Sequence, residues 1–444
     1  MDSARLGDLD RRHVWHPFTQ HQEWNAGPPL IVERASGCWL EDADGNRMLD
    51  GVSCLWCNVH GHRHPAIDAA IREQLDRVAH TTLLGLSHPP AIELAAELAR
   101  RAPPGLERVF YSDSGSTATE IAVKIAFQYQ RQVGAPHRTR FATLAGAYHG
   151  DTIGAVSIGA IETFHEIFRP LLFPTAILPA PYDPGGLEEA DCLQAALEIL
   201  DREGPNLAAL IVEPLVQGAA GMKMHSPAFV RVLAERARAH GALVIVDEVA
   251  VGFGRLGTLF ATEQAGFSPD LLCLAKGISG GYLPLAATLA TDAIYEAFVA
   301  EPSALRQLFH GHTYTGNPLA CAAGLASLRL FDTEGTLAHV AALETQFAAR
   351  LARIRQIPGV TGIRHRGVMA GIDLAAPDGS PLPYELRVGH KLCMAARPRG
   401  LVIRPLGETL VINPPLALSA SEADHLFDVV EALLTHELPA LSAR

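Results

Sequence analysis

Short runs of β-branched and other apolar residues alternate along the chain with longer stretches in which apolar residues recur at helical spacing. This alternation is typical of an α/β fold with a mostly parallel central sheet. The predicted strands span 108–111, 140–144, 208–213, 242–249 and 271–275. The predicted helices span 117–132, 192–203, 227–240, 319–331 and 337–354, and a closing helix begins at Ser421.

These elements predict a large α/β domain and a smaller α/β domain. The large domain is expected over 56–325 and the small one over 326–444, with the N-terminal segment 1–55 joining the small domain. With 444 residues, 48% of them hydrophobic, the chain is long enough to bury one large core and a second, smaller one.

Composition narrows the class of protein. The net charge of -12, without long runs of one sign, argues against nucleic acid as a partner. The first residues carry acids and form no long apolar stretch, and no apolar run reaches the roughly 20 residues that span a bilayer. Seven irregularly spaced cysteines do not form a disulfide pattern. We therefore expect a cytoplasmic protein that binds no membrane.

The strand predicted at 242–249 carries an acid near its carboxyl end. Five uncharged residues precede Asp247, which suits a strand buried on both faces. Open α/β sheets bind ligands at this edge, and a buried carboxylate needs a cationic partner. Alternation along a strand puts Val249 on the same side as Asp247 and Glu248 on the other. An acid beside an apolar contact suits a flat cationic ring, although a strand-end acid that caps the next loop is an equal alternative.

The next predicted strand ends at Lys276, before the glycine-rich turn 277–281. A desolvated lysine has a lowered pKa and becomes a nucleophile toward aldehydes, whereas a lysine that reaches out to solvent is the ordinary alternative. Together, Lys276 and Asp247 supply what pyridoxal phosphate needs: an amine for its aldehyde and an anion for its ring nitrogen. At about 4 Å and an effective dielectric of about 20, that ion pair contributes roughly 4 kcal/mol, or about three decades of rate.

A candidate phosphate cradle precedes the helix predicted at 117–132. Ser114, Gly115 and Ser116 are small residues at a helix N-terminus, where backbone N–H groups and the helix dipole favour an anion. An ordinary N-cap is the alternative, and it is compatible with phosphate binding. Tyr148, in the loop after the strand predicted at 140–144, offers an aromatic face that can stack on the ring.

Two other motifs predict different chemistry and are weaker. Gly252, Gly254 and Gly257 match the dinucleotide pattern G-x-G-x-x-G, but the acids precede the glycines and no convincing helix follows. Cys54-x-x-Cys57 with nearby histidines suggests zinc, but the ligand spacing is irregular. We expect neither a nicotinamide site nor a metal.

Three motifs identify the chain as similar to the class III aminotransferases: Val246-Asp247-Glu248-Val249, Cys273-Leu-Ala-Lys276-Gly277 and His312-Thr313-Tyr-Thr-Gly316-Asn317-Pro318. The resemblance covers nearly the whole chain. It implies a fold-type I, pyridoxal-phosphate-dependent enzyme that forms a homodimer. Further motifs around Phe18, Tyr148, Glu213 and Arg404 resemble the branch that aminates 8-amino-7-oxononanoate in biotin biosynthesis, with S-adenosylmethionine as the expected amino donor.

The resemblance also implies roles for individual residues. Lys276, Asp247 and Tyr148 would be catalytic. Arg404 would hold the carboxylate of the oxononanoate, and Thr313 would reach the phosphate of the neighbouring subunit. The implied cofactor-binding residues are Ser114, Gly115, Ser116, Tyr148, His149, Glu213, Asp247, Val249, Lys276 and Thr313. The implied substrate-binding residues are Phe18, Trp56, Tyr148, Asp151, Arg255, Gly311, His312 and Arg404.

Three positions depart from the donor-side pattern of that branch. Phe18 stands where the branch has Tyr, Leu55-Trp56 replaces a Trp-Trp pair, and Gly311-His312-Thr313 replaces Gly-Pro-Thr. Relatives with similar departures include enzymes that use lysine as donor, so S-adenosylmethionine and lysine both stay open. Another ω-amino-acid aminotransferase, a nicotinamide oxidoreductase and a binding protein without catalysis are the remaining alternatives.

Overall fold

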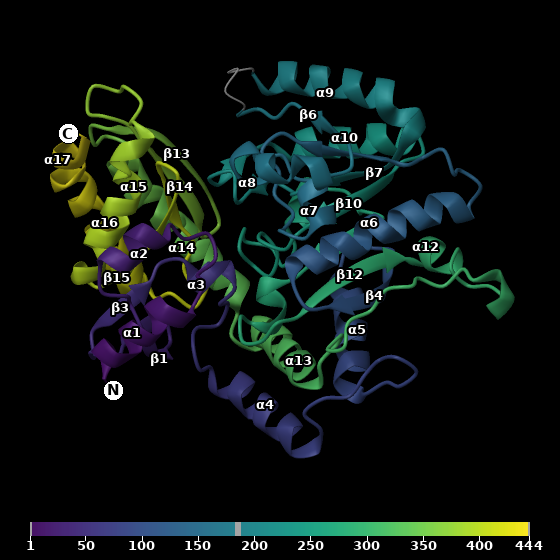
Figure 1. The fold of residues 1–444 in the computed structure, drawn as a ribbon, viewed down its shortest axis with the longest axis horizontal. Coiled ribbons are helices and arrows are strands. Elements are labelled where there is room, and N and C mark those ends of the chain that lie inside the picture. Colours follow the sequence, from purple (N-terminus) through teal and green to yellow (C-terminus); the bar gives the residue numbers. More distant parts are fainter. Residues whose placement is uncertain (1, 183–187, 443–444) are drawn as a thin grey trace.

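The computed structural model describes residues 2–182 and 188–442. Figure 1 shows two lobes: a larger one built around a long twisted sheet, and a smaller one that holds the elements at both ends of the chain. The first helix, α1 (Ser3–His13), and the last, α17 (Leu438–Ser442), both lie in the smaller lobe. No helix of the described residues is both long and apolar enough to cross a membrane.

A seven-stranded sheet forms the centre of the larger lobe, in the order β4-β12-β11-β10-β7-β5-β6. The bounds are β4 (Leu106–Ser112), β5 (Arg140–Leu144), β6 (Thr175–Leu178), β7 (Leu207–Val212), β10 (Leu243–Asp247), β11 (Leu271–Leu274) and β12 (Ala286–Thr291). β12 runs antiparallel to both of its neighbours, β4 and β11, and the other neighbouring strands are parallel, so the sheet is mixed and mostly parallel. The predicted α/β fold and all five predicted strands are confirmed, with ends that differ by at most two residues.

Helices cover both faces of this sheet because its central strands are apolar on both sides. In β10, Val244 and Val246 pack into one core cluster, and Leu243 and Ile245 pack into the other. The helix α6 (Gly115–Gln132) covers the second face. The opposite face is covered mainly by α5 (Pro89–Arg101), α9 (Glu189–Glu203), α10 (Pro227–Ala239) and α13 (Pro318–Thr333). The remaining elements of this lobe are α4 (Pro65–Arg77), α7 (Ile153–Ser157), α8 (Glu162–His165), α11 (Ala261–Ala265), α12 (Asp292–Glu296), β8 (Val216–Gln217) and β9 (Lys223–Met224).

The smaller lobe contains two four-stranded sheets. One has the order β1-β2-β3-β15 and the other β13-β14-β17-β16. Their bounds are β1 (Val32–Ser36), β2 (Trp39–Asp42), β3 (Arg47–Asp50), β13 (Val360–Arg366), β14 (Met369–Leu374), β15 (Leu401–Val402), β16 (Arg404–Leu406) and β17 (Thr409–Ile412). The helices are α2 (His21–Ala26), α3 (Ser53–Trp56), α14 (Thr336–Ile354), α15 (Val388–Ala396) and α16 (Ala420–His436).

The parallel pairing of β3 with β15 joins the beginning of the chain to its last quarter. Leu49 pairs with Leu401, and Asp50 pairs with Val402. This contact supports the proposal that segment 1–55 belongs with residues 326–444. The division at 55 and 325 stays a prediction. The pairing also places Gly51, just before the turn that carries Trp56, against Val402 and Ile403, the residues that precede Arg404.

Candidate active site

Lys276 lies directly beyond the carboxyl end of β11, at the start of a short 3-10 helix (Lys276–Ser279). Because β10 and β11 are parallel neighbours with Asp247 opposite Cys273, the ends of both strands reach the same edge of the sheet. Burial lowers the pKa of the Lys276 amine, against the opposing effect of the carboxylates of Asp247 and Glu213. A buried amine near two acids is suited to nucleophilic attack on an aldehyde.

Asp247 is held in one orientation by two donors. Its Oδ2 lies 2.7 Å from Nδ1 of His149, and its Oδ1 accepts a hydrogen bond of 2.9 Å from the backbone N–H of Val249. The other ring nitrogen of His149, Nε2, lies 3.2 Å from the hydroxyl of Thr143, on β5. Asp247 and His149 are both almost entirely buried. The carboxylate is therefore fixed at the sheet edge, as the ring nitrogen of a cationic heterocycle would require.

Glu248 points away from this site, as strand alternation predicts. Its Oε2 accepts a hydrogen bond of 2.7 Å from the N–H of Ala261, and its Oε1 accepts one of 2.7 Å from the N–H of Thr262. Asp247 and Glu248 therefore have different roles: Asp247 faces the candidate site, and Glu248 accepts from the first N–H groups of α11 on the other side of the strand.

Glu213 and Tyr148 form the wall next to Asp247. The carboxylate of Glu213 accepts hydrogen bonds from the backbone N–H groups of Tyr148 (3.2 Å) and Gly218 (3.0 Å). Burial, with the nearby Asp247, raises the pKa of Glu213 to about 7, although His149 opposes the shift. The Tyr148 hydroxyl donates to Oδ2 of Asp151 at 2.8 Å. Burial and this hydrogen bond raise the pKa of Tyr148, so its hydroxyl stays a donor at neutral pH.

The N-terminus of α6 has the properties of an anion cradle. Ser114 is its N-cap, and its hydroxyl accepts from the N–H of Thr117. In the described residues the N–H groups of Gly115 and Ser116 have no protein acceptor, as at any helix start. A Cβ on Gly115 would lie 2.4 Å from Cγ1 of Val249, so only glycine allows this close approach. The cradle therefore lies against Val249, two residues beyond Asp247.

The Ser116 side chain organises the same region. Its hydroxyl accepts a hydrogen bond of 2.9 Å from the N–H of Thr152 and lies 2.9 Å from the Thr152 hydroxyl. Gly150, with φ 119°, passes so close to Ser116 that a Cβ would lie 2.4 Å from it. The loop that carries Tyr148, His149 and Asp151 is thus held against the start of α6.

Trp56 covers the amine of Lys276. The centroid of its ring lies 5.4 Å from Lys276 Nζ, and Gly218 leaves room for the ring edge. Trp56 is buried, and its indole N–H has no acceptor among the described residues. The backbone of this turn is unusual, since Ser53, Cys54 and Trp56 all have positive φ angles. A buried N–H without a partner is the kind of donor that a bound ligand can satisfy.

Arg404 and Phe18 reach the same region from the smaller lobe. Burial lowers the pKa of Arg404, and Tyr148 is one of the groups that interact with it. The ring centroid of Phe18 lies 5.3 Å from that of Phe164, which lies 6.3 Å from that of Tyr148. Tyr148, Phe164 and Phe18 thus form a row of rings that links the Tyr148 loop to the N-terminal segment.

His165 completes this row and is a residue that motif reasoning missed. Its ring is nearly parallel to that of Tyr148, with centroids 6.5 Å apart. It is buried, and neither of its ring nitrogens has a side-chain or backbone partner in the described residues. Phe164 was missed too. No motif marks either residue; the only signal was an aromatic pair shortly after the Tyr148 loop.

Of the predicted residues at 311–313, His312 contacts the start of α6, whereas Gly311 and Thr313 show no such contact among the described residues. Gly311 and Thr313 are exposed, and no hydrogen bond of the described residues joins Thr313 to the surroundings of Lys276. His312 Nδ1 lies 2.6 Å from a carboxylate oxygen of Asp113, next to the N-terminus of α6, and its Nε2 lies 3.1 Å from that of His310. The role of Thr313 toward a neighbouring subunit stays a prediction.

Arg255 is fully buried, and its guanidinium is surrounded by protein acceptors. It donates to the carbonyl oxygens of Asn58 and Pro414, each at 2.6 Å, and to the hydroxyl of Ser53 at 2.9 Å. Burial lowers its pKa to about 10. The structure therefore places Arg255 behind the turn that carries Trp56, and its predicted role on the substrate side stays a prediction.

Comparison with known proteins agrees with this geometry. The sequence profile of the class III aminotransferases matches residues 21–434, and the chain belongs to this family of pyridoxal-phosphate-dependent transaminases. It is similar to the adenosylmethionine-8-amino-7-oxononanoate aminotransferases of Nitratidesulfovibrio vulgaris (52% identity; 97% of this chain, 82% of the relative) and Geobacter sulfurreducens (46%; 97% of both).

Solved structures give the same result. The enzyme of that name from Methanocaldococcus jannaschii is 38% identical, with a TM-score of 0.93 over 98% of this chain and 99% of the other. An (S)-enantioselective omega-transaminase from Thermomicrobium roseum is 37% identical, with a TM-score of 0.92 over 98% of each chain. The predicted family, fold and transaminase chemistry are confirmed.

Proposed function

We propose that this enzyme transfers an amino group to 8-amino-7-oxononanoate and forms 7,8-diaminononanoate in biotin biosynthesis. The observation that carries the proposal is the near-full-length similarity to relatives named for this substrate, at 52% and 46% identity. The position of Arg404 in the structure adds support, because it brings a cation close to Tyr148. A planar guanidinium is suited to bind the carboxylate of an oxo acid.

The proposed cofactor is pyridoxal 5'-phosphate, and the residues around Lys276 fit it. A buried amine, a fixed carboxylate and two helix-start N–H groups match its aldehyde, ring nitrogen and phosphate. When bound, the cofactor would act as an electron sink for the carbon that gains or loses the amino group. Lys276 would hold the aldehyde, Asp247 would keep the ring nitrogen protonated, and Gly115 and Ser116 would bind the phosphate.

Lys276 is also the proposed proton carrier. Since burial lowers its pKa, a larger share of the amine is neutral near pH 7, as a general base requires. The Trp56 ring over Nζ limits the approach of water to the amine. Asp247, fixed by His149, opposes this shift but keeps a carboxylate at the sheet edge. The amine can therefore collect a proton from a bound donor and return it to an acceptor.

The amino donor is proposed to be S-adenosylmethionine, with lysine as the alternative. Both relatives are named for the first donor. Phe18 instead of Tyr and Leu55 before Trp56 are the departures that keep lysine open. The test is a half-reaction: the holoenzyme is mixed with either amine alone, and conversion of the cofactor to its amine form is followed by absorbance. The amine that converts the cofactor is the donor.

A second candidate function is a broader ω-amine transaminase. The Thermomicrobium roseum enzyme, with a TM-score of 0.92, is the specific observation that favours it. In steady-state assays the two proposals differ clearly. Turnover that requires 8-amino-7-oxononanoate supports the first, whereas turnover of simple ω-amines with pyruvate, and none with the oxononanoate, would replace it by the second.

We also propose that the enzyme acts as a homodimer in the cytoplasm. Large apolar side chains at Leu84, Phe309 and Tyr314 are exposed on this chain, which is typical of surfaces that a partner covers. Thr313 is next to Tyr314 in the sequence, so a second subunit bound over Tyr314 would bring Thr313 toward the phosphate site of that subunit. Light scattering coupled to gel filtration measures the mass in solution and separates a dimer from a monomer.

A further inference from the structure

Three side chains from residues 50–62 meet at the end of β3. Asp50 is the last residue of the strand, Cys54 lies in the turn before Trp56, and His62 follows in the next loop. His62 Nε2 lies 3.0 Å from Asp50 Oδ2, Cys54 Sγ lies 3.5 Å from the same oxygen, and Sγ and Nε2 are 3.9 Å apart. The cluster thus combines a nitrogen, an oxygen and a sulfur atom.

These separations suit a small divalent metal ion. Zinc binds nitrogen and oxygen ligands at about 2.0–2.2 Å and thiolate at about 2.3 Å. At tetrahedral angles such ligands stand roughly 3.3–3.6 Å apart. The observed distances of 3.0, 3.5 and 3.9 Å lie below, within and above this range, so shifts of a few tenths of an ångström would complete the geometry. Cysteine, histidine and aspartate are also the side chains that zinc prefers.

The Asp50 carboxylate is the centre of the hydrogen bonds in this cluster. Asp50 Oδ2 faces three donors: the N–H of Cys54 at 2.8 Å, the Cys54 thiol and the ring of His62. Its Oδ1 already accepts from the N–H groups of Val52 and Cys54. The N–H of Cys54 is shared between the two oxygens, so four donors meet the roughly four lone-pair sites of the carboxylate. A cation bound by Oδ2, the Cys54 sulfur and the His62 nitrogen would replace the thiol and imidazole protons that lie between these atoms.

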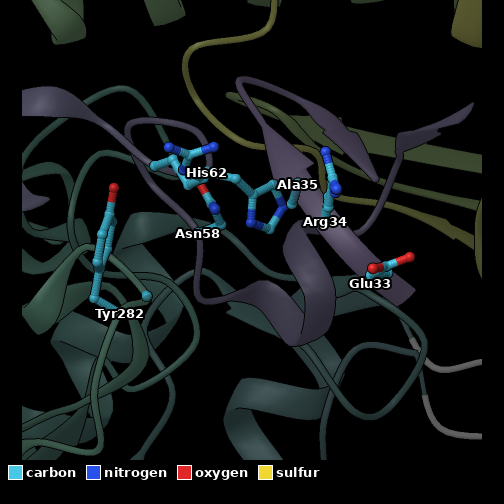
Figure 2. Close-up of a pocket in the computed structure, with 8 residues that line it drawn as sticks. Glu33, Arg34, Ala35, Asn58, His62 and Tyr282 are labelled. Atoms are coloured by element: carbon cyan, nitrogen blue, oxygen red, sulfur yellow. The ribbon is translucent and has the colours of Figure 1, made fainter. Parts of the chain in front are cut away.

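The cluster is reachable from solvent. Asp50 is fully buried, but Cys54 is exposed. His62 also borders a cavity of about 440 Å³, lined by Arg34, Asn58, Tyr282 and other residues (Figure 2). An ion can therefore enter beside Cys54, and a water molecule can occupy a fourth position. The cavity contains none of the residues assigned to the active site.

We propose that Asp50 Oδ2, Cys54 Sγ and His62 Nε2 bind one Zn²⁺ ion, with water as fourth ligand. Binding releases the thiol proton of Cys54, while His62 stays neutral and carries its proton on Nδ1. The charge of the site changes from -1 to zero. The ion cross-links β3, the turn that carries Trp56 and the loop at His62. This function lies outside the proposed transamination and holds for any substrate of the enzyme.

The test uses untagged holoenzyme with reduced thiols and Co²⁺ as a spectroscopic substitute for zinc. We expect one equivalent per chain, with the intense ligand-field bands of four-coordinate cobalt at the red end of the spectrum, where the pyridoxal cofactor does not absorb. Zinc should displace the cobalt. Cys54→Ser and His62→Gln should each weaken binding by about tenfold or more. Cys57→Ser is the matched control and should keep the bands, because Cys57 lies on the same loop but outside the cluster.

A second measurement needs no variant. Zinc should protect Cys54 of the wild-type enzyme from alkylation by iodoacetamide, as read by peptide mass spectrometry, and a chelator should restore the reaction. Absence of the cobalt bands in the wild type, unchanged bands in Cys54→Ser, or alkylation that zinc does not slow would each overturn the proposal. Metal binding that survives Cys54→Ser would place the ion elsewhere, such as the His310–His312 pair.

Discussion

Nδ1 of His149 lies 2.7 Å from Oδ2 of Asp247, and both side chains are almost completely buried. If Nδ1 carries the hydrogen, Nε2 is free to accept from the hydroxyl of Thr143, which lies 3.2 Å away. The Thr143 hydroxyl thereby fixes the orientation of the His149 ring, and the ring fixes the orientation of the Asp247 carboxylate. A carboxylate that must hold a ring nitrogen protonated needs such a fixed position, because a rotation would move its oxygens away from that nitrogen.

Asp247→Asn should retain the cofactor and lose about three decades in kcat. The ion pair with the ring nitrogen is worth roughly 4 kcal/mol at about 4 Å and an effective dielectric of about 20. Steady-state kinetics gives the rate, and cofactor absorbance gives the occupancy. Activity within tenfold of wild type would mean that a group other than Asp247 holds the ring nitrogen.

Lys276→Ala should abolish turnover and leave the fold intact. The amine has a pKa lowered by burial, so its removal takes away a group whose charged form is disfavoured in the folded protein. The unfolding temperature of the apoenzyme should therefore equal or exceed that of the wild type. Turnover within tenfold of wild type would contradict the assignment of Lys276 as the catalytic amine. A strongly lowered unfolding temperature would instead indicate a structural role.

Arg404→Ala should raise the Michaelis constant for the oxononanoate about ten- to a hundredfold. A charge-assisted hydrogen bond contributes roughly 1.5–3 kcal/mol, which corresponds to this range. Arg404→Lys is the matched control. It keeps the positive charge but lacks the planar guanidinium, so it should raise the Michaelis constant less than Arg404→Ala does. The two half-reactions are followed separately, and the donor half should change much less. Equal losses in both halves would make Arg404 a common anchor or a structural residue.

Gly115→Ala should destabilise the apoenzyme by about 1–3 kcal/mol, because the new Cβ would lie 2.4 Å from Cγ1 of Val249. In the Gly115→Ala/Val249→Ala double variant this clash disappears. The double variant should therefore be more stable than the sum of the single changes predicts. Denaturant unfolding of the apoenzymes measures the coupling without the cofactor. If the destabilisations of the two single variants simply added in the double variant, Gly115 and Val249 would not be in tight contact.

The stability of the apoenzyme should depend on pH through Glu213. Its pKa is raised to about 7 by burial, so the folded protein keeps this proton at pH values where the unfolded chain has lost it. The stabilisation from this group is complete below about pH 4.5 and disappears as the pH rises through about 7. Between pH 5 and 8, the free energy of unfolding of the wild type should fall by up to about 3 kcal/mol relative to that of Glu213→Gln. If the unfolding free energies of the wild type and of Glu213→Gln changed equally with pH over this range, the raised pKa of Glu213 would be refuted.

The sequence alone was sufficient for the elements and for the family. Val244, Ile245 and Val246 form an apolar run that is a strand in any α/β context, and β10 appears where that run predicts it. Lys276 after β11 and Ser114 before α6 follow from the same local signals. Such features depend on neighbouring residues, whose spacing along the chain is already their spacing in the structure.

The tertiary structure decided which distant groups meet. His149 and Asp247 are 98 positions apart, and their 2.7 Å contact arises because the loops after β5 and β10 end at one sheet edge. Arg255 reaches the carbonyl oxygens of Asn58 and Pro414, contacts that its motif does not predict, and its role toward the substrate stays a prediction. The sequence presents Cys54 and Cys57 as a possible metal pair, whereas the structure brings Cys54 together with Asp50 and His62 and leaves Cys57 outside the cluster. Packing of lobes and strand ends determines these contacts, and no local periodicity encodes them.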